Sequence, residues 1–211
     1  HTRAVMKIQE GCDNRCTYCI IPSVRGGVRS RPLEEIRREA EALAQAGFQE
    51  LVLTGIHLTS YGRDVKDGTT LLDAIRAAHD VPGIARVRLG SLEPVVVTPE
   101  FVEGIKALPK VCHQFHLALQ SGSDTVLARM HRRYTSGEFL TACAMLREAF
   151  EDCALTTDVM TGFPGETEAE AMDTVSLVEE VGYDALFTFI YSPRPGTKAA
   201  AMPDPATRAE K

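Results

Sequence analysis

The sequence predicts an α/β protein made of six successive β-α units with parallel strands. Two observations support this: apolar runs of strand length recur along the chain, and amphipathic segments with clear helix-start signals lie between them. Strands that alternate with helices are joined by right-handed crossovers and therefore run parallel. The pattern leaves two architectures open, namely an open doubly wound sheet and a partial barrel.

The six expected strands are short apolar runs of the kind found in parallel sheets that are covered on both faces. They lie at Ala4–Gln9, Glu50–Thr54, Arg86–Leu89, Gln114–Leu119, Ala154–Val159 and Ala185–Tyr191. Because the carboxyl ends of parallel strands meet at one edge, the residues that follow each strand are expected to gather there.

The helices between these strands carry readable ends. The first is expected to start with Pro32 at its first position, to hold Glu34 and Glu35 in its first turn, and to stop at Gly47. Similar signals mark the later helices: the Thr98-Pro99 start, the capping boxes Thr135/Glu138 and Thr167/Glu170, and the terminating Gly182.

Composition places the chain among ordinary globular proteins. Of its 211 residues, 44% are hydrophobic and 25% are charged. No apolar run approaches the roughly 18 residues that cross a bilayer, so we expect a cytoplasmic protein without a membrane partner. The net charge of −6 lacks the broad basic surface of a self-sufficient nucleic-acid binder. Because the chain starts at His1 and ends in the polar segment 203–211, we expect residues 1–211 to be one excised domain.

Three of the six cysteines crowd into the loop after the first expected strand. Cys12, Cys16 and Cys19 have the spacing C-x3-C-x2-C, whereas the other three are dispersed: Cys112, Cys143 and Cys153. A disulfide framework is typical of small secreted domains, so a reduced protein with one thiolate cluster is the simpler interpretation. Cys143 lies on the apolar face of an expected helix, where buried packing is the expected role.

Three thiolates suit a 4Fe–4S cluster with one open iron. Each of the four irons needs a ligand beyond its sulfides, and the fourth iron can take the amino and carboxylate groups of S-adenosylmethionine. One-electron transfer then cleaves that cofactor to a 5′-deoxyadenosyl radical, so the cofactors supply the reactivity and no side chain is assigned as catalytic. The alternatives are fortuitous clustering and a zinc site, although no fourth ligand stands at zinc-finger spacing.

With Tyr18 before its third cysteine, the motif resembles the signature of the radical S-adenosylmethionine superfamily, and longer stretches resemble its methylthiotransferases. These stretches are Glu10-Gly11-Cys12, Cys19-Ile20-Ile21-Pro22, Arg25-Gly26, Arg29-Ser30-Arg31-Pro32, Leu53-Thr54-Gly55-Ile56-His57, Leu119–Ser123, Met130–Tyr134, Asp158–Thr167 and Tyr191–Thr197. The resemblance implies a partial TIM-like (β/α)6 barrel. It also implies that the family's N-terminal methylthiotransferase domain and C-terminal RNA-binding domain are absent from residues 1–211.

The resemblance further implies a substrate and partners. Thr54-Gly55-Ile56-His57 followed by Tyr61-Gly62 is most similar to the subgroup that modifies N6-threonylcarbamoyl-adenosine at position 37 of tRNA, whereas the isopentenyl-adenosine subgroup usually has Gly-Gln-Asn there. The implied partners are the tRNA anticodon region and an electron donor such as flavodoxin or ferredoxin. Alternatives are another tRNA base, a ribosomal protein aspartate, or a non-catalytic metal-binding module.

Polar and glycine residues near the expected strand ends are the candidates for holding S-adenosylmethionine, as in the superfamily. They are Tyr18, Thr54, Gly55, Ser91, Glu93, Gln120, Ser121, Asp158 and Gly162. For Asp158 a strand-end carboxylate is the alternative, and for Gly162 a tight turn.

Basic residues form a second set of candidates. Arg25, Arg29, Arg31, Arg132 and Arg133 could contact phosphate or the cofactor carboxylate, or could form a solvated surface. His57, after the second strand, could also approach the cofactor.

Overall fold

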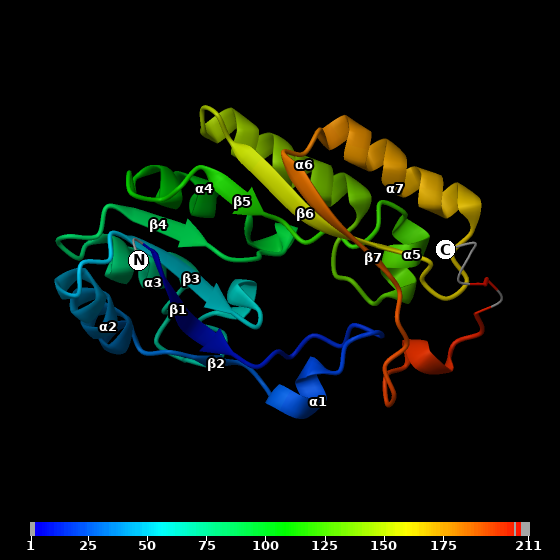
Figure 1. The fold of residues 1–211 in the computed structure, drawn as a ribbon, viewed down its shortest axis with the longest axis horizontal. Helices are drawn as coiled ribbons and strands as arrows, with labels where there is room; N and C mark the ends of the chain where they lie inside the picture. Colours follow the sequence, from blue (N-terminus) through cyan, green and yellow to red (C-terminus); the bar gives the residue numbers. More distant parts are fainter. Residues whose placement is uncertain (1–2, 205, 208–211) are drawn as a thin grey trace.

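A computed structural model describes residues 3–204 and 206–207 of the chain (Figure 1). The expected domain limits at residues 1 and 211 therefore lie outside the described residues. The strands are β1 (Arg3–Glu10), β2 (Arg29–Ser30), β3 (Glu50–Gly55), β4 (Arg86–Leu89), β5 (Gln114–His116), β6 (Ala154–Thr161) and β7 (Ala185–Ile190). The helices are α1 (Ile21–Arg25), α2 (Leu33–Gln45), α3 (Leu71–His79), α4 (Pro99–Lys106), α5 (Asp124–Arg129), α6 (Ser136–Ala149) and α7 (Glu168–Val181), with short 3-10 turns at Leu58–Ser60, Pro94–Val96 and Ala199–Ala201.

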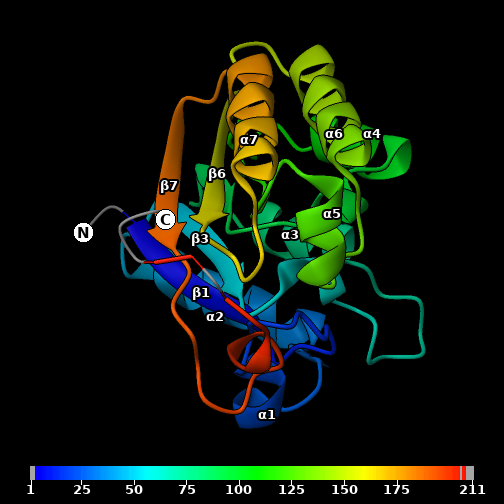
Figure 2. The same ribbon diagram turned by 90° about the vertical axis from the view of Figure 1, so that its right-hand side faces the viewer.

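The six predicted parallel strands are confirmed, and they form a curled half-barrel rather than an open doubly wound sheet. Hydrogen bonding gives the strand orders β2-β1-β3-β4 and β5-β6-β7. Two isolated bridges, Val87 to Val111 and Leu92 to Leu117, join the two parts near β5. Figure 2 shows the helices along the outer side of the curved sheet.

Three details of the expected pattern differ from the structure. The fifth strand ends at His116 because at the junction only isolated bridges continue the pairing. The short β2 was not predicted, and it pairs antiparallel with the end of β1. The sixth unit lacks an α-helix within residues 3–204, since β7 is followed by the 3-10 turn at Ala199–Ala201.

The core lies between the strands and the outer helices. Leu51 of β3 pairs with Ala4 of β1 on one side and with Val87 of β4 on the other, and it is fully buried. Ile36 of α2 and Ile75 of α3 are also fully buried in this cluster. Burial of each such side chain contributes about 1.5–3 kcal/mol. The predicted packing role of Cys143, on α6, is confirmed by its burial in the same core.

Most predicted helix ends are confirmed. Thr135 and Thr167 each accept a hydrogen bond from the backbone N–H three residues later, and each forms a complete capping box. Gly182 ends α7 in the left-handed conformation. Pro32 caps α2 instead of being its first residue, because its ψ of 142° is extended.

Ion pairs link the first three parallel strands of the sheet. Glu50 of β3 is buried and forms ion pairs of 2.9–3.0 Å with three arginines of β1 and β4: Arg3, Arg86 and Arg88. At the far edge, Phe187 and Phe189 of β7 are each 55% exposed. Among the described residues, no helix has the length and apolar character to cross a membrane.

Candidate cluster and cofactor site

The cysteine loop, residues 11–20, follows β1 and is anchored at both ends. Gly11 adopts a φ of 71° at the start of the loop, and the backbone N–H of Cys12 donates to the carbonyl of Gly26 at 3.0 Å. Farther along, Thr17 donates from its backbone N–H to Met130 O at 3.0 Å and from its hydroxyl to Arg129 O at 2.9 Å. The loop is therefore fixed to the end of α1 on one side and to the end of α5 on the other.

The three cysteines of the loop are free thiols in different surroundings. Cys12 is buried, and its sulfur accepts a hydrogen bond from the backbone N–H of Asn14 at 3.4 Å. The Cys16 sulfur accepts one from Nη1 of Arg132 at 3.4 Å, whereas Cys19 borders a cavity. Burial raises the pKa of Cys12 and Cys16. Sulfurs that accept hydrogen bonds in this way suit thiolate ligands of an iron–sulfur cluster.

A single metal ion imposes a different arrangement. In the described part of the chain, no three histidine, cysteine or acidic side chains are grouped around one point. A single zinc ion needs ligand sulfurs that converge at about 2.3 Å from the metal. The thiolates of a cubane cluster each bind a different iron and lie farther apart.

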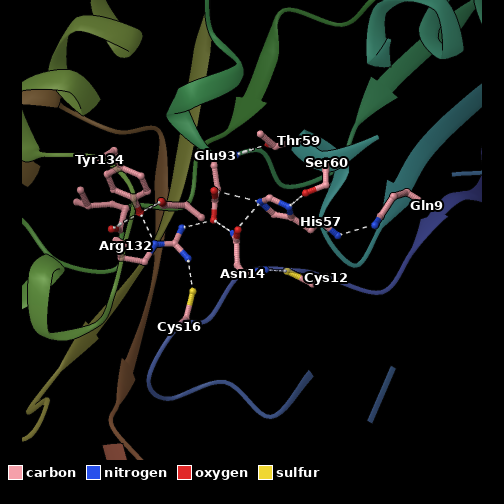
Figure 3. A network of polar contacts seen from close by, with 12 residues as sticks. Gln9, Cys12, Asn14, Cys16, His57, Thr59, Ser60, Glu93, Arg132 and Tyr134 are labelled. Carbon is pink, nitrogen blue, oxygen red and sulfur yellow. Dashed lines mark hydrogen bonds and ion pairs between the residues drawn. The ribbon is translucent and has the colours of Figure 1, made fainter. Parts of the chain in front are cut away.

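A buried network of charged and polar side chains contacts the cysteine loop next to Cys12 and Cys16 (Figure 3). Its centre is Glu93, whose Oε1 accepts from Nδ2 of Asn14 at 3.1 Å and pairs with Nη2 of Arg132 at 2.9 Å. The other oxygen, Oε2, lies 3.1 Å from Nε2 of His57. The side chains of Glu93 and Arg132 are each only 7% exposed.

Further hydrogen bonds hold this network in place. Nε of Arg132 donates to the Tyr134 hydroxyl at 3.0 Å, and the guanidinium lies 4.9 Å from the centre of that ring. The backbone N–H of Glu93 donates to the Thr59 hydroxyl at 2.9 Å, while that of His57 donates to Oε1 of Gln9 at 2.7 Å. The network thus joins the ends of β1, β3 and β4 to the segment that follows α5.

The surroundings of Glu93 favour the charged form of its carboxylate. Burial alone would raise the pKa of Glu93, but the hydrogen bond with His57 and the charge of Arg132 hold it below its usual value. Burial would likewise lower the pKa of Arg132, yet the surrounding groups, with Tyr134 and Tyr18 foremost and Glu93 next, raise it above its ordinary value. The pair is therefore a buried ion pair at neutral pH.

A cavity of about 500 Å³ lies beside Cys19. Its lining comes from the cysteine loop and from the ends of β5, β6 and β7: Tyr18, Cys19, Ile20, Ile21, Gln120, Asp158, Met160, Phe189, Ile190, Tyr191, Ser192 and Arg194. This volume is typical of a small-molecule site. A second cavity of about 480 Å³ lies between residues 59–72 and 95–101, with no cysteine in its lining.

Three of the nine predicted cofactor residues line the cavity beside Cys19: Tyr18, Gln120 and Asp158. Gln120 adopts a left-handed φ of 69°, its backbone N–H donates to Asp158 O and its carbonyl accepts from Met160 N, both at 2.8 Å. Oδ2 of Asp158 lies 3.2 Å from Nε2 of His116. These residues can offer polar groups to a ligand in the cavity.

The other six predicted residues, all of them described, lie outside this lining: Thr54, Gly55, Ser91, Glu93, Ser121 and Gly162. Ser121 is fully buried, and its hydroxyl lies 3.3 Å from that of Thr174 on α7. Glu93 belongs to the charge network, Ser91 is exposed, and the backbone N–H of Gly162 donates to Glu166. Gly55 packs against Gln9, because a Cβ there would approach Oε1 of Gln9 to 2.8 Å. A cofactor contact by any of these six stays a prediction.

The candidate arginines divide into buried and exposed ones. Arg132 is buried in the charge network, so it is not a surface contact for RNA. Arg31 forms ion pairs with Glu35 and Glu39 of α2, whereas Arg25, Arg29 and Arg133 are exposed. Sequence reasoning did not single out Asn14 or Met160. Their sequence signals are a place inside the cysteine motif for Asn14 and, for Met160, a place just after an expected strand and inside the family-like stretch Asp158–Thr167.

The sequence profile of the Radical SAM superfamily matches residues 6–178. The chain belongs to this superfamily, which confirms that resemblance, and with it the enzyme class and the predicted cofactors, S-adenosylmethionine and a 4Fe–4S cluster.

Several curated proteins match nearly the whole of this chain. The chain is similar to proteins named tRNA-2-methylthio-N(6)-dimethylallyladenosine synthase. It is 46% identical to that of Frankia alni over 202 residues, which is 96% of this chain and 41% of that protein. It is 45% identical to that of Symbiobacterium thermophilum over 217 residues, covering 99% and 46% of the two chains. The chain thus spans less than half the length of these curated relatives. Their names do not support the predicted threonylcarbamoyl subgroup.

Solved structures with low sequence identity share the fold. The radical S-adenosylmethionine methyltransferase TsrM from Kitasatospora setae matches with a TM-score of 0.76 and 20% identity, covering 93% of this chain and 38% of that one. Methylornithine synthase (PylB) matches with a TM-score of 0.66 and 12% identity, covering 99% and 58%. These likenesses confirm the half-barrel.

Proposed function

We propose that this chain is the radical core of a tRNA methylthiotransferase, with its cluster on Cys12, Cys16 and Cys19. The observation that carries the proposal is the anchored loop with three free thiols beside a cavity of about 500 Å³. The similarity to tRNA methylthio-adenosine synthases, which extends over 96–99% of this chain, supports the same activity.

The residues present fit both cofactors. The three thiols would ligate the cluster, and the cavity would hold S-adenosylmethionine between Tyr18, Gln120 and Asp158. Together the bound groups supply hydrogen abstraction from an unactivated carbon. The Asp158 carboxylate can accept a hydrogen bond from a hydroxyl or amino group of the ligand, and His116 holds that carboxylate in place. Apolar Met160 and Ile190 would exclude water from the other side.

We further propose that the substrate is an N6-modified adenosine of the tRNA anticodon region. The names of the relatives favour the dimethylallyl group. A second candidate is the threonylcarbamoyl group, which the Thr54-Gly55-Ile56-His57 stretch favours. The chemistry requires a low-potential electron donor such as flavodoxin or ferredoxin, and a tRNA substrate implies action in the cytoplasm. Since the relatives are more than twice as long, we propose that methylthio transfer needs parts beyond these 211 residues.

Anaerobic reconstitution with iron and sulfide tests the cluster assignment. We expect a broad absorption band near roughly 400 nm and, after addition of dithionite and S-adenosylmethionine, release of 5′-deoxyadenosine. Lack of both the band and the product would refute the radical function and favour the non-catalytic module.

The substrate is tested separately, with a full-length form of the protein. It is incubated with tRNA that carries either dimethylallyl- or threonylcarbamoyl-adenosine, and mass spectrometry detects an added methylthio group. Modification of only one tRNA identifies the N6 substituent, and modification of neither would exclude both candidates.

A further inference from the structure

We propose that Arg132 sets the reduction potential of the cluster through the Cys16 sulfur, and that Glu93 holds Arg132 in the position that allows this. The inference rests on the proposed cluster assignment and deepens it. Arg132 acts through a cluster ligand, and it is therefore a positioning and tuning residue, not a catalytic one.

The sulfurs of Cys12 and Cys16 accept hydrogen bonds from different kinds of donor. Cys12 accepts a hydrogen bond from a neutral backbone N–H, that of Asn14. Cys16 accepts one from the charged guanidinium of Arg132. A hydrogen bond from a charged donor to a ligand sulfur stabilises the reduced cluster, which carries one more negative charge than the oxidised cluster.

Arg132 has a fixed orientation. Its Nε donates to Tyr134, its Nη2 pairs with Glu93, and its plane lies near the Tyr134 ring. A guanidinium is a rigid planar fork, so these contacts direct Nη1 at the Cys16 sulfur (Figure 3). A lysine ammonium could keep the charge but could not make all of these contacts together.

The positive charge of Arg132 is buried together with a partner charge. A buried guanidinium needs a partner charge, because an unpaired ion in the interior is strongly destabilising. Glu93 supplies that charge and is itself bound to Asn14 of the cysteine loop and to His57 after β3. Both members of the ion pair are therefore tied to the cluster loop, Arg132 through Cys16 and Glu93 through Asn14.

The two charges should shift the potential in opposite directions. Loss of the positive charge in Arg132→Gln makes addition of an electron harder, and the potential becomes more negative. Glu93→Gln keeps an amide oxygen that can accept from Arg132 and Asn14, so it removes the negative charge and leaves the guanidinium in place. Addition of an electron then becomes easier, and the potential becomes more positive. A role limited to holding the fold together would not produce shifts of opposite sign.

An EPR-monitored redox titration of the reconstituted chain tests the inference. At a fixed solution potential, we expect the ratio of reduced to oxidised cluster to fall about tenfold in Arg132→Gln, the size of one charge-assisted hydrogen bond. For a one-electron couple this is about 59 mV. Arg132→Lys should shift less in the same direction. Arg133→Gln, at the exposed neighbouring residue, is the matched control and should leave the potential unchanged.

The outcomes separate this inference from the proposed function. If the wild-type chain forms no cluster, the proposed function fails and the inference fails with it. If the wild-type chain forms a cluster but Arg132→Gln has the same potential, only the inference fails. Where Arg132→Gln does not retain its cluster, Arg132→Lys decides, and an unchanged potential there overturns the inference. Equal shifts in Arg132→Gln and Arg133→Gln would also overturn it, because they would indicate net charge alone.

Discussion

The two sides of the cysteine loop are built differently. On the Cys12 and Cys16 side, the buried side chains of Glu93 and Arg132 pair with each other. On the Cys19 side lies a cavity of about 500 Å³ with Asp158 at its wall and a strained backbone at Gln120. One side is thus suited to hold a resident group firmly, and the other to admit and release a ligand.

This difference follows the division of the sheet. The closed side takes His57 and Glu93 from the ends of β3 and β4, in the first part of the sheet, and Arg132 from the segment after α5. The open side takes its lining from β5, β6 and β7, where β7 is an edge strand with Phe189 and Ile190 exposed. The cysteine loop lies between the two parts, with Cys12 and Cys16 on one side and Cys19 on the other.

The largest effect is expected from removal of a cluster ligand. Cys16→Ala should abolish cluster assembly, since two thiolates cannot hold a cubane with only one open iron. Iron and sulfide content after anaerobic reconstitution measures this. Cys143→Ala is the matched control, because this thiol is buried in the helical core far from the loop, and its cluster content should match the wild type. Equal loss in both variants would contradict the division of the cysteines.

The next largest effect is expected in the free energy of unfolding, which should differ between variants of the closed side and of the open side. Glu93→Ala leaves the buried Arg132 without its partner charge and should lower the free energy of unfolding by about 3–5 kcal/mol. Asp158→Asn, in a side chain that is 33% exposed, should lower it by less than about 1 kcal/mol. Urea unfolding of the cluster-free proteins measures both values.

Replacement of Asp158 should affect cofactor binding more strongly than it affects the free energy of unfolding. In the reconstituted protein, Asp158→Asn should weaken S-adenosylmethionine binding about tenfold, the size of one charge-assisted hydrogen bond. Equilibrium dialysis measures the affinity. A stability loss at Asp158 as large as that at Glu93 would show that the open side is structural as well.

The fold was largely predictable because its signals are local. Apolar runs marked the six parallel strands, and the threonine caps of α4, α6 and α7 depend on contacts within three residues. The two-residue β2 was not predictable, because Ser30 is held by Asp64, which lies 34 residues away. The curvature of the sheet likewise depends on which strands pair, and hydrophobic periodicity does not encode this pairing.

The site was predictable only in part, for a similar reason. The spacing of the three cysteines is local, whereas Glu93 meets Asn14 and Arg132 only through the fold. The contact between the Ser121 hydroxyl and Thr174 of α7 joins residues 53 positions apart, so it too had no local signal.

The pH dependence of the free energy of unfolding tests the ion pair between Arg129 of α5 and Glu170 of α7. Glu170 of α7 closes a capping box with Thr167 and pairs with Arg129 of α5, and the hydrogen bond from Arg129 lowers its pKa from 4.5 to about 2. A lowered carboxyl pKa stabilises the fold above the unfolded value of 4.5. This stability is lost as the pH falls from 4.5 toward about 2. Glu170→Gln should therefore cost about 2 kcal/mol at pH 7 and progressively less below pH 4.5.

Glu138 offers the matched control for this measurement. It closes an equivalent capping box with Thr135 on α6, but no arginine pairs with it within the described residues. Glu138→Gln should cost only the cap, about 1 kcal/mol. Chemical unfolding at a series of pH values between 2 and 7 compares the two variants. Identical pH profiles would mean that Arg129 contributes nothing beyond the cap.

The smallest effect is expected from relief of the backbone strain at Gln120, which lines the cavity. Gln120 has a φ of 69°, a conformation that costs a residue with a side chain about 1 kcal/mol or more and glycine almost nothing. Gln120→Gly should therefore raise the free energy of unfolding by about 0.5–1 kcal/mol, with part of the gain offset by the greater freedom of glycine in the unfolded chain. It should also weaken S-adenosylmethionine binding, because the side chain that lines the cavity is lost.

Asp152→Gly is the control for Gln120→Gly, because it relieves a left-handed backbone conformation outside the cavity. Asp152 has a φ of 51° and lies exposed in the turn between α6 and β6, outside the cavity lining. Asp152→Gly should give a similar gain in the free energy of unfolding with no change in the affinity for S-adenosylmethionine. Chemical unfolding and equilibrium dialysis measure the two quantities. If Gln120→Gly destabilises the chain while Asp152→Gly stabilises it, the contacts of the Gln120 side chain outweigh its backbone strain. The open side would then be as firmly built as the closed one.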